Sequence, residues 1–123
     1  MAKRQQKKGN PEHGLQVAAT QFMSWALDGE VQFFAISNNP RSAITGHLEK
    51  QRGMVAGVGD HCVFGRRGNG EMFVGFLEYK SEKGRQSPKQ KEWEKICMET
   101  GAEYAVIRNL EQLKETLEDW NLL

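Results

Sequence analysis

Residues 72–80 read MFVGFLEYK, an apolar run that ends in a glutamate and a lysine two positions apart. Unbroken apolar character over this length is typical of a strand that is buried on both faces, so it predicts a central strand with helices on each side. Residues two apart on a strand point to the same face, and Glu78 and Lys80 are therefore expected to project together. Charged groups are costly to bury, which makes this end of the strand a candidate functional site.

A glycine-rich turn, residues 57–60, precedes a second apolar run at residues 61–64. If the two runs pair as a hairpin around the turn at residues 65–70, Asp60 lies beside Glu78. Two carboxylates and an ammonium at one end of a sheet make sense where a divalent cation and a phosphate supply the compensating charges. The glycine-rich stretch lacks the GK[ST] of a P-loop and does not follow a strand, which excludes a nucleotide-binding loop.

The rest of the chain supplies helices and further strands around this hairpin. Asn10-Pro11, Asn39-Pro40 and Ser87-Pro88 each place a capping residue before a proline, which predicts three helix starts. A fourth helix is predicted from Asn109. Strands are predicted at residues 31–37, 61–64, 72–80 and 103–108. The order α-β-α-β-β-α-β-α implies an α/β fold with a mixed sheet between helices, a three-layer α-β-α arrangement.

Length and composition restrict the function classes. The chain has 123 residues, which suits one domain, predicted here as residues 10–123 behind a disordered basic arm at residues 1–9. The net charge of +1 does not by itself indicate a nucleic-acid binder. No apolar run approaches the roughly 20 residues that span a bilayer, and no secretory signal is present. Cys62 and Cys97 have no zinc spacing, and we interpret them as reduced thiols of a cytosolic protein.

Hydrolysis of a phosphodiester needs a cation on the non-bridging oxygen, an activated water and help for the leaving oxygen. Asp60 and Glu78 are the expected ligands of Mg²⁺, with the backbone carbonyl of Tyr79 as a possible third oxygen. Lys80 is expected to orient or help deprotonate the water. Glu12 lies on the inward side of the first helix and is expected to bind the metal through water or to hold a second ion.

These features together resemble the VRR-NUC (virus-type replication-repair nuclease) domain of the PD-(D/E)xK nuclease superfamily, in its stand-alone phage and bacterial form. The matching motifs run in order from residue 12 to the end of the chain: Glu12-His13-x-x-Gln16, Gly57-Val58-Gly59-Asp60, Glu78-Tyr79-Lys80, Gly84-x-x-Ser87-x-x-Gln90 and Gly101-Ala102. The family often has proline before the aspartate, where this chain has Gly59.

The resemblance implies a restriction-endonuclease-like fold and a metal-dependent DNA nuclease similar to Holliday-junction resolvases. It implies Mg²⁺ or Mn²⁺ as cofactor, branched DNA as substrate, a homodimer, and a cytoplasmic location in a bacterium or phage-infected host cell. Carried over by position, the catalytic residues are Glu12, Asp60, Glu78, Lys80 and Gln90.

Several assignments have a plain structural alternative. Gln90 also completes a capping box, and Gln16 is either a support for Glu12 or an ordinary polar helix residue. His61 follows Asp60 directly and is expected to face away from the site. Candidate DNA-binding cations, any of which can equally belong to a solvated face, are Lys83, Arg85, Lys89, Arg66 and Arg67. Two other functions remain open: a non-catalytic DNA-binding module of the same fold, and a sequence-specific restriction-type endonuclease.

Overall fold

The computed structural model describes residues 10–37 and 43–123 and contains the predicted order of elements. The helices are α1 (Pro11–Ala26), α2 (Ala43–Gln51), α3 (Pro88–Thr100) and α4 (Leu110–Asp119). The strands are β1 (Val31–Ala35), β2 (His61–Arg66), β3 (Met72–Tyr79) and β4 (Glu103–Ile107). The predicted arm at residues 1–9 and the predicted start of the second helix at Asn39-Pro40 lie outside the described residues.

Capping fixes the helix boundaries as the sequence predicted. The Asn10 side chain accepts hydrogen bonds from the backbone N–H groups of Glu12 and His13, and proline follows at the first helical position. Ser87 and Gln90 form a complete capping box at the start of α3. Gly101 ends α3 with a left-handed φ of 87°, which glycine adopts without steric cost.

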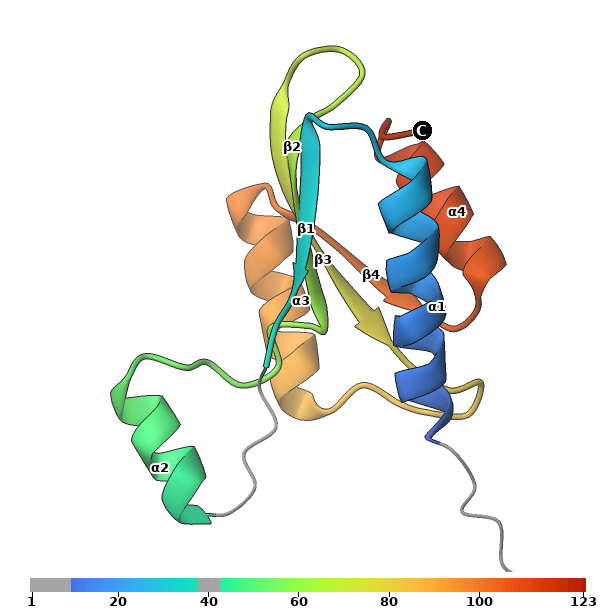
Figure 1. The fold of residues 1–123 in the computed structure, drawn as a ribbon. Helices are drawn as coiled ribbons and strands as arrows, with labels where there is room; N and C mark the ends of the chain where they lie inside the picture. The colour runs from blue at the N-terminus through green and yellow to red at the C-terminus, as the bar shows by residue number, and fades with distance from the viewer. Residues whose placement is uncertain (1–9, 38–42) are drawn as a thin grey trace, which may run out of the picture.

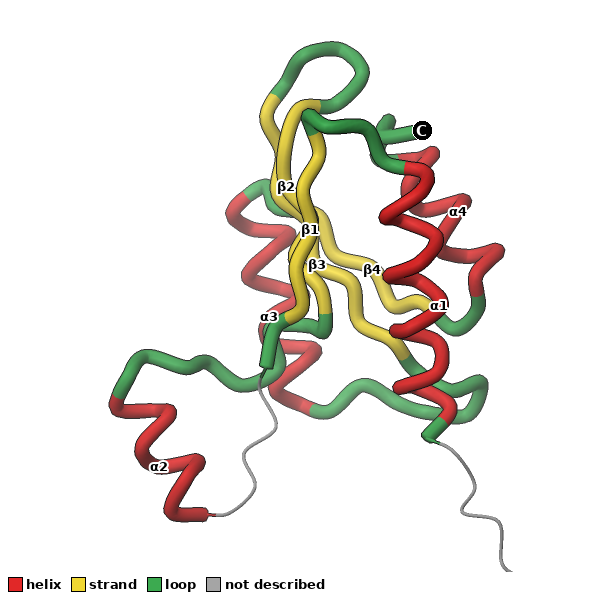
Figure 2. The backbone as a smooth tube through the Cα atoms, in the orientation of Figure 1, coloured by secondary structure: helices red, strands yellow, loops and turns green. Residues whose placement is uncertain are grey.

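The four strands form one mixed sheet in the order β1-β2-β3-β4. β2 and β3 form the predicted antiparallel hairpin, and β3 pairs in parallel with β4 after the crossover through α3. α1 and α4 lie together on one face of the sheet and α3 lies on the other (Figures 1 and 2). β3 is thus an interior strand, as predicted.

The main core lies between the sheet and the α1–α4 pair. Alternate residues of β3 point into it, so that Leu77 and Tyr79 are fully buried, and Trp120 of the segment after α4 packs against Gly75. A Cβ on Gly75 would lie 2.7 Å from the indole ring, which explains the absence of a side chain there.

The prediction that the central strand is buried on both faces was wrong in part. The first half of β3 is not covered on the α3 face, where Met72 is 64% exposed, because α3 covers the sheet farther along, at Phe76. Two large apolar side chains of the other face's helices also lie outside the core. Trp25 near the end of α1 is 84% exposed, and Leu110 is exposed in the first turn of α4.

No Cα atom of helix α2 lies within 8 Å of a Cα atom in another helix or strand of the described chain. It lies apart from the rest of the fold in Figure 1, and its apolar Ile44 is 76% exposed. None of the helices in the described residues is long and apolar enough to cross a membrane.

Candidate acidic site at the end of the central hairpin

The glycine-rich turn before β2 fixes Asp60 against β3. Gly59 has a left-handed φ of 109°, and a Cβ there would lie 3.2 Å from the Leu77 carbonyl oxygen. The backbone N–H of Asp60 donates to the Leu77 carbonyl at 2.8 Å. The Asp60 carboxylate in turn accepts the backbone N–H of Tyr79 through Oδ2 at 2.8 Å. The aspartate is therefore held at both its backbone and its side chain.

Glu78 is the most deeply buried acid of the site, with 4% of its surface exposed. The Lys80 Nζ lies 3.9 Å from the Glu78 Oε2, as the spacing on one strand face predicted. Burial is the largest cause that raises the pKa of Glu78 to about 8, and the neighbouring Asp60 carboxylate raises it further. The Lys80 ammonium opposes this effect. Burial and the neighbouring carboxylates together thus outweigh the lysine, so the pKa of Glu78 stays well above its ordinary value.

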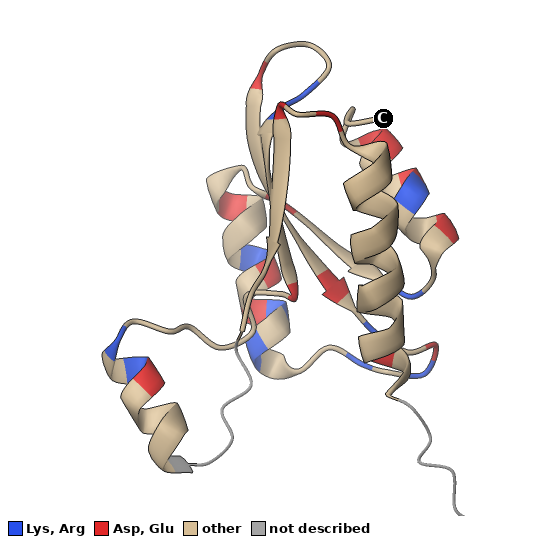
Figure 3. Ribbon diagram, in the orientation of Figure 1, with Lys and Arg blue, Asp and Glu red and all other residues tan. Residues whose placement is uncertain are grey.

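Glu12 joins the site from the start of α1. Its Oε2 accepts the backbone N–H of Ser81, the residue after Lys80, at 3.3 Å. Its charge also contributes to the raised pKa of Glu78. Figure 3 shows acidic positions at the start of α1 and near the tip of β3, at the same end of the sheet. The structure therefore brings Glu12, Asp60, Glu78 and Lys80 together.

The two candidate glutamines occupy supporting positions. The Gln16 side chain donates to the Asp60 carbonyl at 3.4 Å, which ties α1 to the turn. Gln90 uses its Oε1 in the capping box, where it accepts the Ser87 N–H at 2.8 Å. A Cβ on Gly57 would lie 2.8 Å from the Gln90 backbone nitrogen, so the turn packs directly on the start of α3. Gln90 is therefore close to the turn, but its side-chain oxygen serves the helix.

The candidate DNA-binding cations separate into two groups. Lys83, Arg85 and Lys89 are exposed in or just after the segment that follows Lys80. Arg66 and Arg67 lie at the opposite end of the hairpin, as the strand register shows. Arg67 belongs to neither alternative, because it is half-buried, pairs with Glu103 at 3.4 Å and donates to the Trp120 carbonyl.

A buried hydrogen-bonded chain lies behind the acids, on the opposite face of the sheet. The Tyr79 hydroxyl is 2.7 Å from the His61 Nδ1, and the His61 Nε2 is 3.3 Å from the Thr20 hydroxyl. Because the Thr20 hydroxyl donates to the Gln16 carbonyl, it is free only to accept from Nε2–H, so Nδ1 accepts from Tyr79. Burial lowers the pKa of His61, in keeping with this neutral form.

His61 thus faces away from the acids, as expected, but its link to Tyr79 was not part of the sequence analysis. The signal was available: two polar residues occupy the same inward face of adjacent strands, where an unpaired polar group would be costly. Arg108, whose guanidinium contacts the segment after Lys80, was also missed. A lone arginine at the end of a strand carries no sequence signal for such a contact.

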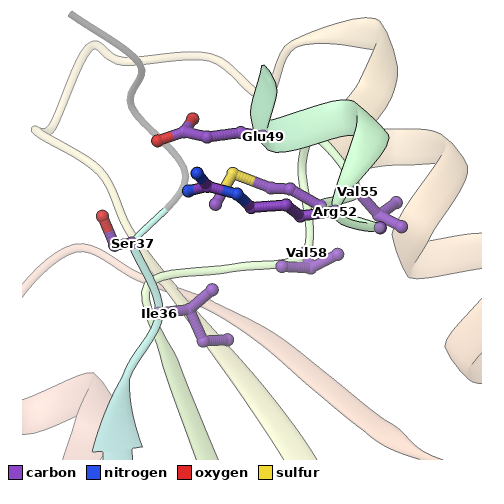
Figure 4. A pocket seen from close by; sticks show the side chains of 8 residues that line it. Ile36, Ser37, Glu49, Arg52, Val55 and Val58 are labelled. Carbon is purple, nitrogen blue, oxygen red and sulfur yellow. The ribbon is translucent and has the colours of Figure 1, made fainter. Parts of the chain in front are cut away.

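A pocket of about 530 Å³ opens beside the glycine-rich turn (Figure 4). Its apolar wall includes Ile36 and Val58, and Glu49 and Arg52 of the α2 segment face it. The Glu49 Oε2 is buried without a hydrogen-bond partner among the described residues. Since the Ile36 N–H donates to the Asp60 carbonyl at 2.9 Å, this pocket adjoins the acidic site.

The donor set of the site fits a hard divalent cation. Among the described residues, no three His, Cys, Asp or Glu side chains form a complete metal-binding group. Mg²⁺ keeps several waters and needs only one or two protein carboxylates, so half-buried Asp60 and buried Glu78 are sufficient. Burial and the neighbouring Asp60 and Glu12 carboxylates raise the pKa of Glu78, and a cation bound between the carboxylates would favour the ionised form.

Comparisons with known proteins agree with one another. The family model described as the VRR-NUC domain matches residues 2–109. A solved structure titled "VRR_NUC domain protein" is similar to this chain with a TM-score of 0.67 and 16% identity, over 92% of this chain and 89% of the other. No curated protein matches the chain. The low identity to the solved structure supports the fold alone, whereas the family match covers most of the sequence and indicates a nuclease-type domain that acts on DNA. The chain therefore belongs to the VRR-NUC family.

Proposed function

We propose that this protein is a divalent-metal-dependent endonuclease that hydrolyses phosphodiester bonds in branched DNA. The observation that carries the proposal is the position of Glu78. Its carboxylate is buried beside Asp60, with Lys80 3.9 Å away and Glu12 close enough to raise its pKa. A merely structural ion pair gains nothing from the additional acids, because their repulsion destabilises the fold.

Each residue has a role that follows from its chemistry. Mg²⁺ or Mn²⁺ bound here supplies Lewis-acid polarisation of the phosphate and acidification of a water. Asp60 and Glu78 provide the carboxylate ligands, with the Tyr79 carbonyl as a third candidate. Lys80 orients the attacking water or helps to deprotonate it, and its ammonium stabilises the charge that develops on the phosphate oxygens. Glu12 accepts hydrogen bonds from waters around the site, and we retain Gln90 as a lesser candidate for the same task.

The substrate assignment rests on charge position and on family membership. Lys83, Arg85 and Lys89 are exposed beside the acids, where they are suited to contact DNA phosphates. Arg66 and Arg67 are at the far end of the sheet and are weaker candidates. The preference for branched DNA, the homodimer and the cytoplasmic location are proposed from the resemblance to stand-alone members. A two-fold assembly would place two acidic sites on opposing strands of a junction.

Cleavage of a labelled panel of DNA substrates tests this function. Four-way junctions, flaps and linear duplexes of the same sequence are incubated with the purified protein and Mg²⁺ or Mn²⁺. Glu78→Gln and Lys80→Met are each expected to slow cleavage at least about 100-fold, because ligand and proton-transfer roles contribute factors of this size. Glu111→Gln, an exposed acid of α4, is the matched control with unchanged rate.

The other outcomes are equally informative. DNA binding without cleavage under either metal would identify a non-catalytic module of the same fold. Cleavage of duplex and junction at equal rates, at one sequence, would identify a restriction-type enzyme. Full activity of Glu78→Gln would remove the acidic site from the mechanism.

A further inference from the structure

The segment between β3 and α3 passes beneath the start of α1, next to the acidic site (Figure 1). It begins with a turn over residues 81–84, closed by the Gly84 N–H donating to the Ser81 carbonyl at 3.1 Å. The Ser81 N–H is the group that donates to the Glu12 carboxylate. The position of this turn therefore decides where Glu12 is held.

The turn is bound by the guanidinium of Arg108, the residue that follows β4. The Arg108 Nη1 donates to the Ser81 carbonyl at 2.6 Å and to the Gly84 carbonyl at 2.7 Å, and it lies 3.4 Å from the Glu82 carbonyl. None of the ion pairs among the described residues includes Arg108. The arginine is therefore committed to backbone carbonyls and not to an acid.

Arg108 is itself anchored at the junction of β4 and α4. Its backbone N–H donates to the Gln112 Oε1 at 2.8 Å, and the Gln112 N–H donates to the Asn109 side chain at 2.9 Å. One residue earlier, the Ile107 carbonyl accepts the Lys80 N–H at 3.0 Å. The strand end that fixes the Lys80 backbone thus also carries the guanidinium that fixes the turn.

The turn has no room to move toward Glu12. A Cβ on Gly84 would lie 3.1 Å from the Glu12 Oε2 and 3.0 Å from the Ser81 hydroxyl oxygen. A side chain at this point would require the Ser81 hydroxyl or the Glu12 carboxylate to shift by a few tenths of an ångström. The hydrogen bonds from Arg108 to the Ser81 and Gly84 carbonyls oppose movement of the turn away from Glu12.

We propose that Arg108 is a positioning residue of the acidic site, which acts by holding the 81–84 turn so that the Ser81 amide keeps the Glu12 carboxylate in place. The expected effect on catalysis rests on the proposed nuclease function. The hydrogen bonds from Arg108 to the turn and from Ser81 to Glu12 do not depend on that function. All of these contacts are made by Nη1, whose two N–H groups have fixed directions in the plane of the guanidinium, whereas the N–H groups of a lysine ammonium have no such plane.

The first test is independent of activity and uses trypsin, since Lys83 and Arg85 are exposed in the held segment. Arg108→Met is expected to speed cleavage after these two residues about tenfold, because release of the turn raises the population of open conformations. Arg108→Lys is expected to restore only part of the resistance. Lys114→Met, which removes an exposed charge from α4, is the matched control and leaves the cleavage rate unchanged.

The same variants allow a spectroscopic test of the link to Glu12. In the ¹H–¹⁵N NMR spectrum, Glu12→Gln is expected to shift the Ser81 amide in the otherwise unchanged protein and to shift it far less in Arg108→Met. Unchanged trypsin resistance in Arg108→Met, or an equal Ser81 shift in both backgrounds, would overturn the proposal. Either result is obtained even if the protein cleaves no DNA.

The catalytic test is a double-mutant cycle. Arg108→Met is expected to lower kcat about tenfold with little change in KM for DNA, and to cause no further loss when Glu12→Gln is already present. A full additional loss in that background, or a raised KM with a weaker salt dependence, would show that Arg108 contacts DNA phosphate directly. That result would also overturn the proposal. Inactivity of the unmodified protein would instead refute the proposed function and leave the trypsin and NMR results to decide on Arg108.

Discussion

Glu78 and Tyr79 are neighbours in the chain but lie in different environments. Glu78 faces Asp60 and Lys80, whereas the Tyr79 hydroxyl is buried on the other face with His61. The alternation of side chains along a strand produces this division. Glu78 therefore belongs to the proposed metal site, and Tyr79 belongs to the buried hydrogen-bonded chain on the opposite face of the sheet.

The raised pKa of Glu78 predicts how stability depends on pH in the metal-free protein. The ordinary pKa of the carboxyl is 4.5 and the folded protein raises it to about 8, so the folded state holds the extra proton between these pH values. The free energy of unfolding is therefore expected to fall as pH rises from 4.5 to 8 and to level off above 8. Glu78→Gln removes this titration and should be more stable than the unmodified protein at pH 8, by at least about 1 kcal/mol.

Urea denaturation at pH 5 and pH 8 without metal measures this effect. The matched control is Glu111→Gln, whose exposed side chain should leave the pH dependence unchanged. Addition of Mg²⁺ at pH 8 should stabilise the unmodified protein more than Glu78→Gln, because the variant has lost one of the two carboxylate ligands. Identical pH profiles for the unmodified protein and Glu78→Gln would contradict the burial of a proton on Glu78.

At the scale of elements, the glycine-rich turn and the start of α3 depend on each other. Gly57 has a left-handed φ of 82°, and a Cβ there would lie 2.6 Å from the Lys89 carbonyl carbon. Gly53, in the C-terminal turn after α2, has a left-handed φ of 96° but open space around the missing Cβ. Comparison of Gly53 with Gly57 therefore separates two free-energy costs of adding a side chain: the cost of a left-handed backbone conformation and the cost of the steric contact with α3.

Substitution of each glycine by alanine makes this comparison. Gly53→Ala is expected to cost about 1 kcal/mol, the penalty of a left-handed non-glycine residue. Gly57→Ala is expected to cost more than that and to slow DNA cleavage as well, because the turn that carries Asp60 must move away from α3. Thermal unfolding and the nicking rate of the two variants are measured side by side. Equal stability and equal activity of the two would show that the Gly57 contact is unimportant.

The order of elements and the hairpin could be predicted from the sequence because their signals are local. Caps at Asn10, Ser87 and Asn109 mark helix starts, and the apolar run before Glu78 marks the central strand. The exposure of Trp25 and Met72 could not be predicted in this way, because it depends on where the opposing helix ends. The hydrogen bonds of Arg108 depend on the meeting of two distant segments, which no local pattern records.

At the scale of the whole molecule, α2 is the element with least support. Its Cα atoms lie more than 8 Å from those of every other helix and strand of the described chain, and it exposes apolar side chains, whereas α1, α3 and α4 pack on the sheet or on each other. Elements with few buried contacts open at low free energy. In the isolated chain, the backbone amides of α2 are therefore expected to exchange hydrogen about 100-fold faster than those of α1, as for an element near the low end of local stability.

Hydrogen exchange followed by mass spectrometry tests this at two protein concentrations. Fast exchange of α2 at low concentration and slower exchange at high concentration would indicate that the second copy in the proposed homodimer covers it. Protection of α2 equal to that of α1 at every concentration would contradict the weak support seen in the fold. The α1 amides serve as the internal control in the same sample.

The alternation along β3 makes the protein unusually sensitive to insertions and deletions in the hairpin. Removal of one residue between Gly65 and Gly70, if the strand re-paired one step along, would move every side chain of β3 to the opposite face of the sheet. The Glu78 carboxylate would then point into the hydrophobic core, and the Tyr79 ring would lie where the cation is proposed to bind. A deletion of one residue would thus disrupt both the core and the proposed acidic site. A deletion of two residues would leave each side chain of β3 on its original face of the sheet.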